Sequence, residues 1–136
     1  MARFYLVDDS LFVLTQLTQI LQKGGHQVVG SAQSGEDALR FLDEHAGTID
    51  AITLDITMPG LDGMEILGRI HQEWPAIMPL IVSGLAKRDL VLEAGRLGAA
   101  GYLIKPLVRE RVLEKIAEVL GTQTITAESG SNGELQ

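Results

Sequence analysis

The sequence contains no cysteine among its 136 residues, and only 4% of its side chains are aromatic. The lack of cysteine excludes disulfide bonds, thiolate metal sites and a cysteine nucleophile. The three histidines, His26, His45 and His71, show no metal-ligand spacing. No apolar run approaches the roughly 18 residues that span a bilayer, so we expect a cytoplasmic protein without membrane insertion.

Positive charge is also scarce. There are 11 Lys and Arg against 18 Asp and Glu, which gives a formal net charge of -7. An acidic chain repels a phosphate backbone, so nucleic acid is not an expected direct partner. With 46% hydrophobic and 21% charged residues, the composition is that of an ordinary globular protein, and the length predicts one domain.

Short apolar, β-prone runs alternate with amphipathic segments along the chain. Strands that read as continuous apolar runs between helices are typical of a parallel sheet that is covered on both faces, so the fold class is α/β. The domain is expected over residues 1–120. Residues 121–136 are polar and rich in Gly and Ser, which predicts a flexible C-terminal tail. The apolar runs are 4–7, 28–32, 51–54, 80–82 and 102–104.

Polar side chains follow four of these runs, at the strand ends where ligands bind in such sheets. Asp8 and Asp9 follow the first run, Asp55 the third, Ser83 the fourth and Lys105 the fifth. Carboxylates held close together repel one another, and a hard divalent cation such as Mg2+ relieves that repulsion. A carboxylate nucleophile, a metal site, a hydroxyl and an ammonium group are the parts that phosphoryl transfer to an aspartate needs.

Four motifs in this order resemble the receiver domain of two-component response regulators, of the CheY-like single-domain type. They are LVDDS at 6–10, LDITMPGLDG at 54–63, VSG at 82–84 and GYLIKP at 101–106. The resemblance covers residues 1–120. It implies a doubly wound (βα)5 fold of the flavodoxin and CheY kind, with five parallel strands in the order 2-1-3-4-5.

The same resemblance implies roles for individual residues. Asp55 is the expected phosphoacceptor, which receives its phosphoryl group from a sensor histidine kinase or a phosphotransfer protein. Asp8 and Asp9, together with Asp55 and the backbone carbonyl of Thr57, are the expected ligands of Mg2+ or Mn2+. Lys105 is expected to bridge to the phosphoryl group, and a cis peptide bond to Pro106 is expected to direct its side chain inward.

Two further residues resemble the switch of this family. Ser83 is the expected hydroxyl that turns toward the phosphoryl group, and Tyr102 the aromatic side chain that changes its exposure in response. Leu85 lies at a position that modulates hydrolysis, and its side chain can neither orient nor activate water. The downstream protein partner is expected at the face formed by the fourth helix, fifth strand and fifth helix. Residues 87–115 in this region carry seven Lys and Arg against four Asp and Glu.

These features predict a phosphorylation-controlled signalling protein, with chemotaxis as one pathway. It is not an enzyme apart from phosphorylating and dephosphorylating itself at Asp55. One alternative is the receiver portion of a larger regulator. Another is a Mg2+-dependent phosphohydrolase acting through an aspartyl phosphate, but Thr57 stands where that class has its second Asp. A scaffold that keeps the fold without the switch is a third alternative, and the intact set of polar residues argues against it.

Overall fold

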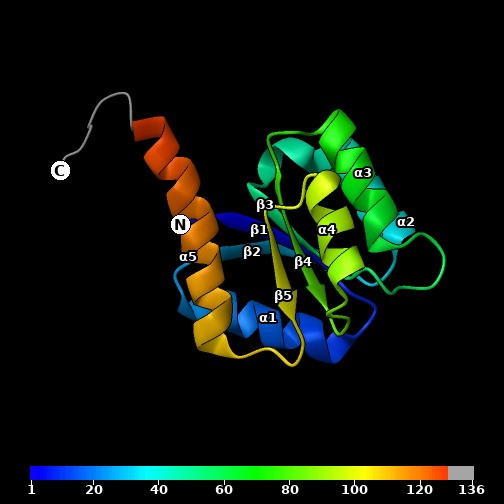
Figure 1. Cartoon of the computed structure of the whole chain (residues 1–136). Helices are drawn as coiled ribbons and strands as arrows, with labels where there is room; N and C mark the ends of the chain where they lie inside the picture. The colour runs from blue at the N-terminus through cyan, green and yellow to red at the C-terminus, as the bar shows by residue number, and fades with distance from the viewer. Residues whose placement is uncertain (129–136) are drawn as a thin grey trace.

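A computed structural model describes residues 1–128 and shows a five-stranded parallel sheet between two layers of helices (Figure 1). The strands lie side by side in the order β2-β1-β3-β4-β5, so the predicted fold class and strand order are confirmed. The strands are β1 (Arg3–Val7), β2 (Gln27–Ala32), β3 (Ala51–Leu54), β4 (Met78–Ser83) and β5 (Gly101–Ile104).

The helices cover both faces of the sheet. One face packs against α1 (Leu11–Lys23) and α5 (Arg109–Glu128). The other packs against α2 (Gly35–His45), α3 (Gly63–Glu73) and α4 (Arg88–Arg96), and a short 3-10 helix (Ala46–Thr48) follows α2. Each face therefore has its own apolar core, which explains why the strands read as continuous apolar runs.

The alternation of side chains along β1 shows how one strand supplies both cores. Phe4 and Leu6 are buried against α1 and α5, whereas Tyr5 and Val7 are buried on the opposite face. Successive side chains of a strand point to opposite faces, so a strand covered on both sides has to be apolar at every position.

Polar caps start the helices directly after the loops at the strand ends. The side chains of Ser10 and Ser34 accept hydrogen bonds from the first turns of α1 and α2. At α3, the Asp62 side chain accepts the Glu65 N–H, and the Glu65 side chain accepts the Asp62 N–H. This reciprocal capping box fixes the direction in which α3 leaves the loop.

The last helix runs further than the sequence predicts. The boundary expected at residue 120 falls inside α5, which continues to Glu128. Between 121 and 128 there is one glycine and no proline, and a single glycine lowers helix propensity by only about 1 kcal/mol, so nothing there has to end the helix. The remainder of the predicted tail, 129–136, lies outside the described residues. Within 1–128, no helix combines the length and the apolar character needed to cross a lipid bilayer.

Candidate phosphoryl-transfer site

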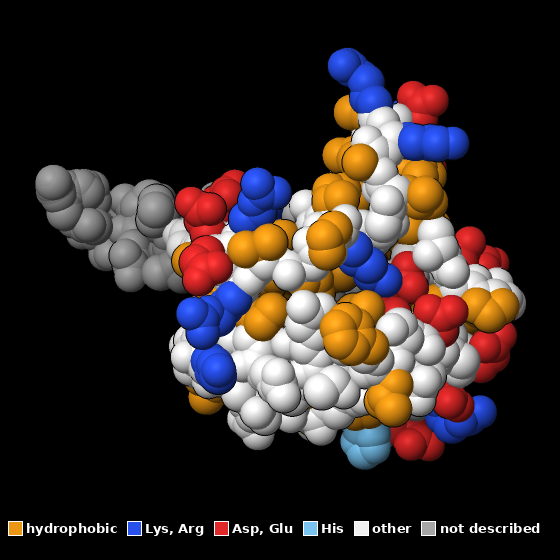
Figure 2. Space-filling model, turned by 90° about the horizontal axis from the view of Figure 1, so that it is seen from below, with side chains coloured by type: hydrophobic (Ala, Val, Ile, Leu, Met, Phe, Trp, Pro, Cys, Tyr) orange, Lys and Arg blue, Asp and Glu red, His pale blue; other side chains and the backbone are white. Residues whose placement is uncertain are grey.

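The polar residues predicted at the strand ends meet at one edge of the sheet. β1, β3 and β5 end directly before Asp8, Asp55 and Lys105, and Ser83 is the last residue of β4. In Figure 1 the strand arrows point to this edge at the bottom of the molecule. Figure 2 looks onto it from below and shows acidic, basic and hydrophobic side chains side by side.

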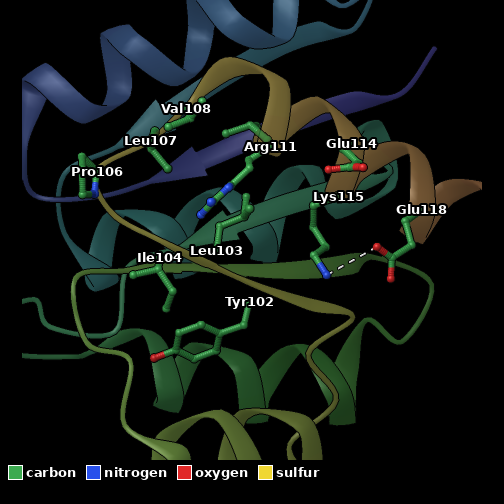
Figure 3. A pocket seen from close by; sticks show the side chains of 11 residues that line it. Tyr102, Leu103, Ile104, Pro106, Leu107, Val108, Arg111, Glu114, Lys115 and Glu118 are labelled. Carbon is green, nitrogen blue, oxygen red and sulfur yellow. Dashed lines mark ion pairs between the residues drawn. The ribbon is translucent and has the colours of Figure 1, made fainter.

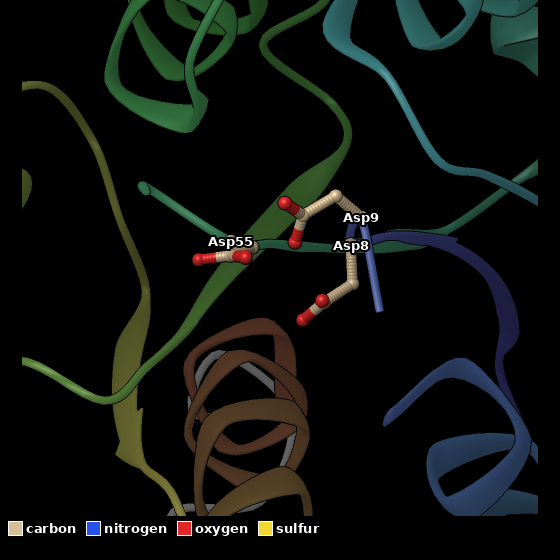
Figure 4. A group of neighbouring side chains, drawn as sticks. All are labelled: Asp8, Asp9 and Asp55. Atoms are coloured by element: carbon tan, nitrogen blue, oxygen red, sulfur yellow. The ribbon is translucent and has the colours of Figure 1, made fainter. Parts of the chain in front are cut away.

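Three carboxylates form the centre of the site. Asp8, Asp9 and Asp55 each contribute an oxygen atom, and these oxygens lie within 4.8 Å of one another (Figure 4). Asp8 and Asp55 are 1% and 2% exposed, whereas Asp9 is exposed to solvent. Two of the three charges are therefore held away from water, where a nearby opposite charge has its largest effect.

Lys105 supplies that opposite charge. Its ammonium nitrogen lies 3.0 Å from Oδ2 of Asp8 and 3.7 Å from Oδ2 of Asp55. The Lys105 N–H donates to the carbonyl of Ser83, which anchors the backbone at the end of β4. The cis peptide bond predicted between Lys105 and Pro106 is confirmed.

The surroundings of Asp8 shift the pKa of its carboxyl in opposite directions. Burial raises the pKa of its carboxyl, and the charge of Asp55 raises it further. The Ser10 N–H, which donates to Oδ1 of Asp8 at 2.9 Å, and the Lys105 ammonium both lower it. Burial dominates, so the pKa of Asp8 lies above its ordinary value and the ionised form carries a cost that Lys105 only partly offsets.

Asp55 is held by its own loop. The backbone N–H and the hydroxyl of Thr57 both donate to Oδ1 of Asp55, each at 3.0 Å. The Asp55 N–H donates to the carbonyl of Val7 and so ties the start of the loop to β1. One carboxylate oxygen is therefore fixed by two donors, while the other, Oδ2, faces Lys105.

The donor set fits a hard divalent cation. The side chains that converge here offer carboxylate oxygens, the ligands that Mg2+ prefers. Oδ2 of Asp8 is buried and pairs with Lys105, and because a carboxylate oxygen has two lone pairs, it keeps capacity for another partner. The role predicted for the carbonyl of Thr57 remains a prediction.

The two residues predicted to form the switch are linked through the loop between β4 and α4. The hydroxyl oxygen of Ser83, which is fully buried, accepts the Leu85 N–H at 3.0 Å. The Tyr102 hydroxyl donates to the carbonyl of Leu85 at 2.8 Å. The N–H and the carbonyl of Leu85 are thus both engaged, one by each predicted switch residue.

Two hollows flank Tyr102 beside β5, the edge strand of the sheet. One, of about 270 Å³, lies between β5 and α5, and its charged lining residues are Arg111, Glu114, Lys115 and Glu118 (Figure 3). The other, of about 340 Å³, lies between α4 and β5. Tyr102 and Lys115 line both hollows, so the predicted switch residue stands between them.

Sequence reasoning missed the local hydrogen bonds that orient the site. Asp and Ser side chains at loop starts commonly accept the backbone N–H two residues further on, and this preference is the signal that could have revealed them. The three instances are Asp8 with Ser10, Asp55 with Thr57, and Ser83 with Leu85. The backbone of Leu85, rather than its side chain, is the feature that joins Ser83 to Tyr102.

Comparisons with known proteins identify the family of this chain. The family model of the response regulator receiver domain matches residues 4–117. The chemotaxis protein CheY of Treponema pallidum is 42% identical over 118 residues, which cover 87% of this chain and 82% of that protein. CheY of Bacillus subtilis is 35% identical, with 87% of this chain and 97% of that protein covered.

Solved structures show the same likeness. A chain in the crystal structure of the CheX-CheY-BeF3-Mg2+ complex from Borrelia burgdorferi superposes with a TM-score of 0.84 at 36% identity, covering 87% of this chain and 88% of that chain. A CheY-like receiver domain from Methanospirillum hungatei gives a TM-score of 0.81 at 27% identity, with 91% and 97% covered. This chain belongs to the response regulator receiver domain family and is a CheY-like member of it.

Proposed function

We propose that this protein is a phosphorylation-controlled switch in which Asp55 accepts a phosphoryl group from a sensor histidine kinase or a phosphotransfer protein. The observation that carries the proposal is the convergence of three carboxylates and one ammonium group at the ends of β1, β3 and β5. Burying two of these carboxylates beside one lysine lowers the stability of the fold, and the cluster supplies the carboxylate nucleophile, cation ligands and ammonium group that phosphoryl transfer to an aspartate needs.

The hydrogen bonds of Asp55 suggest which oxygen reacts. Oδ1 is held by Thr57, so Oδ2, which faces Lys105, is the oxygen that attacks phosphorus. The new O–P bond forms as the P–N bond of a phosphohistidine breaks, and the electron pair of that bond stays on the imidazole, which takes up a proton. With acetyl phosphate as donor, the P–O bond breaks instead and acetate leaves with the electron pair.

Asp8 and Asp9, with Asp55 and the carbonyl of Thr57, would hold Mg2+, or Mn2+ in its place. When bound, the cation shares the negative charge of the transferring phosphoryl group. The Lys105 ammonium, released from Asp8, then has Oδ2 of Asp55 and the phosphoryl oxygens as its remaining acceptors. The relative solved as a complex with CheX, BeF3 and Mg2+ supports this choice of cation.

The switch follows from the shared bonds of Leu85. If the Ser83 hydroxyl turns to a phosphoryl oxygen on Asp55, the Leu85 N–H loses its acceptor and the loop between β4 and α4 has to rearrange. That movement displaces the carbonyl that holds the Tyr102 hydroxyl, so Tyr102 changes its position between the two hollows beside β5. The phosphoryl group thereby shifts a two-state equilibrium.

The output surface that we propose consists of α4, β5 and α5. Val91, Leu92, Ile104 and Val108 expose apolar side chains there. The surrounding positive charge favours a protein partner with acidic residues beside its apolar contacts. The protein would act by contact in the cytoplasm, with no substrate beyond its own phosphoryl group. Because the relatives named above are chemotaxis proteins, chemotaxis is the pathway to test first.

The test is intact mass spectrometry after incubation with acetyl phosphate, with and without Mg2+. Wild-type protein should gain the mass of one phosphoryl group only when Mg2+ is present, and Asp55→Asn should gain none. Asp62→Asn is the matched control, because Asn caps a helix as well as Asp does and this residue caps α3 outside the acidic cluster. It should be modified like the wild type.

Two results would overturn the proposal. Modification that persists in Asp55→Asn would place the phosphoacceptor elsewhere. Absence of any adduct with acetyl phosphate, together with no binding of beryllofluoride in the presence of Mg2+, would favour a scaffold that keeps the fold without the chemistry.

A further inference from the structure

Gly63, the first residue of α3, lies so close to the backbone of Asp55 that no residue with a side chain would fit at this position. A Cβ atom added to Gly63 would overlap the carbonyl oxygen of Asp55 and would lie 2.8 Å from its carbonyl carbon and 3.0 Å from Cα of Ile56. Contacts under 3.0 Å to backbone atoms cannot be relieved by rotating a side chain. An alanine at 63 therefore has to move either α3 or the peptide that follows Asp55.

The helix cannot easily yield, because the capping box holds its start. The N–H of Asp62 donates to the Glu65 side chain at 3.0 Å, and the Glu65 N–H donates to the Asp62 side chain at 3.0 Å. Ile66 and Leu67 in the next turn are fully buried. Moving the first turn of α3 would break two hydrogen bonds and disturb the core, so the peptide after Asp55 is the part that shifts.

That peptide orients the reactive carboxylate. It leads to Thr57, whose N–H and hydroxyl both hold Oδ1 of Asp55. Rotation of the peptide between Asp55 and Ile56 would carry these two donors away from Oδ1. The Asp55 side chain would then lose the bonds that fix its direction toward Asp8 and Lys105.

A second glycine contacts the other end of the same loop. A Cβ on Gly35, the first residue of α2, would overlap the carbonyl oxygen of Leu61 and lie 2.9 Å from its Cβ. The loop from Ile56 to Leu61 is thus enclosed between the N-terminal turns of α2 and α3. A side chain at either glycine would press on the loop from a different side.

We propose that Gly63 and Gly35 are positioning residues, whose missing side chains let two helix starts fix the loop that aims Asp55 and Thr57. This inference rests on the proposed function, because it concerns the geometry of the same acceptor. Neither glycine touches the reacting atoms; each acts through the backbone of the loop. A positioning role differs from a packing role in its consequence: an alanine variant that folds normally should still be phosphorylated more slowly.

The experiment compares Gly63→Ala and Gly35→Ala with Gly68→Ala. Gly68 lies in the same helix as Gly63, and a Cβ there would meet nothing within 4 Å. Each variant is first shown to be folded by NMR, well below its melting temperature. Initial rates with acetyl phosphate are then measured by intact mass over a range of donor concentrations, and Mg2+ affinity is measured by calorimetry.

Gly63→Ala should be modified about 10- to 100-fold more slowly than the wild type, mainly through the maximal rate, because a displacement near 1 Å has effects of that size. Its Mg2+ affinity should fall by about tenfold, as for other groups that orient metal ligands. Gly35→Ala should show the same two defects to a smaller extent. Gly68→Ala should keep the wild-type rate and affinity and gain thermal stability, because alanine favours a helix.

The inference is wrong if folded Gly63→Ala reacts and binds Mg2+ like the wild type, whatever its melting temperature. It is also wrong if Gly63→Ala cannot fold while Gly35→Ala folds and reacts normally, or if neither folds, since the glycines would then serve the fold alone. A wild-type chain that acetyl phosphate does not modify would instead refute the proposed function, so the two failures are distinguishable.

Discussion

Thr53 is expected to lower the free energy of unfolding, and one substitution should raise it. It lies in the middle of β3, is 1% exposed, and its hydroxyl has no hydrogen-bond partner among the described residues. In the register of the sheet it sits between Leu6 of β1 and Leu80 of β4, two members of the core under α1 and α5. A polar hydroxyl is thus buried in apolar surroundings.

Replacing Thr53 by valine exchanges the hydroxyl for a methyl group of nearly the same shape. A buried polar group without a partner costs about 1 to 3 kcal/mol, and both residues favour strands, so the free energy of unfolding should rise by about 1 to 2 kcal/mol. For a chain of this length, each kcal/mol corresponds to a melting temperature higher by about 3 to 5 °C.

Urea and thermal unfolding of Thr53→Val measure this gain. Thr18→Val in α1 is the matched control, because its hydroxyl donates to the carbonyl of Leu14 at 2.8 Å. The control should change the free energy of unfolding by no more than about 0.5 kcal/mol, since such bonds within a helix contribute little. A Thr53→Val protein that is no more stable than the wild type would refute the reasoning. Modification at Asp55 should be unaffected.

Three other substitutions test the electrostatics and the switch. Lys105→Met removes the ammonium paired with Asp8, so calorimetry should show tighter Mg2+ binding while modification by acetyl phosphate slows by about tenfold or more. The pKa of His26 is lowered by burial and then by the N-terminal charge, and its neutral ring accepts the Ala2 N–H at 3.1 Å. Its contribution to stability is therefore complete above 6.5 and is lost as the pH falls toward the lower folded pKa. His26→Asn keeps an acceptor that does not titrate, so urea unfolding above and below this pH should show a smaller loss. Tyr102→Phe should lower the free energy of unfolding by about 0.5 to 1 kcal/mol and leave the modification rate unchanged.

Each of these has a contrary result. Weaker Mg2+ binding in Lys105→Met would mean that the lysine supports the cation site rather than competing for Asp8. An unchanged pH dependence in His26→Asn would assign the acid sensitivity to carboxyl groups. A large loss of modification in Tyr102→Phe would place the hydroxyl in the chemistry rather than in the response to it.

The sequence predicts the fold well because burial on both faces leaves an unambiguous mark. Five apolar runs separated by amphipathic segments allow few arrangements other than a parallel sheet between helices. Boundaries are less well predicted. β4 begins at Met78, two residues before the predicted apolar run. The prediction starts too late because proline is unfavourable inside a strand, yet Pro79 pairs with Ile52 of β3.

Directions of side chains are where sequence reasoning is weakest. Leu11 fits the helical spacing of Leu14, Leu17 and Leu21, yet it is 65% exposed, and Phe12 beside it is 75% exposed. Periodicity indicates which way a residue points around a helix, but not whether the sheet extends beneath that turn. The same gap hides the close approach of Gly63 to Asp55, which depends on the path of a loop.

Charge connects the site to the switch. Three carboxylates and one ammonium leave two net negative charges at the strand ends, and a bound dication would cancel them. The proposed phosphorylation would replace the single charge of Asp55 by about two negative charges on a phosphoryl group, so the site would gain one negative charge that neither the dication nor Lys105 balances. A buried donor that turns toward the new oxygens lowers that cost, and the Ser83 hydroxyl is such a donor at the neighbouring strand end. In the proposed switch, the movement of Ser83 would then be a consequence of charge balance, and the hydrogen bonds of Leu85 would transmit it to Tyr102.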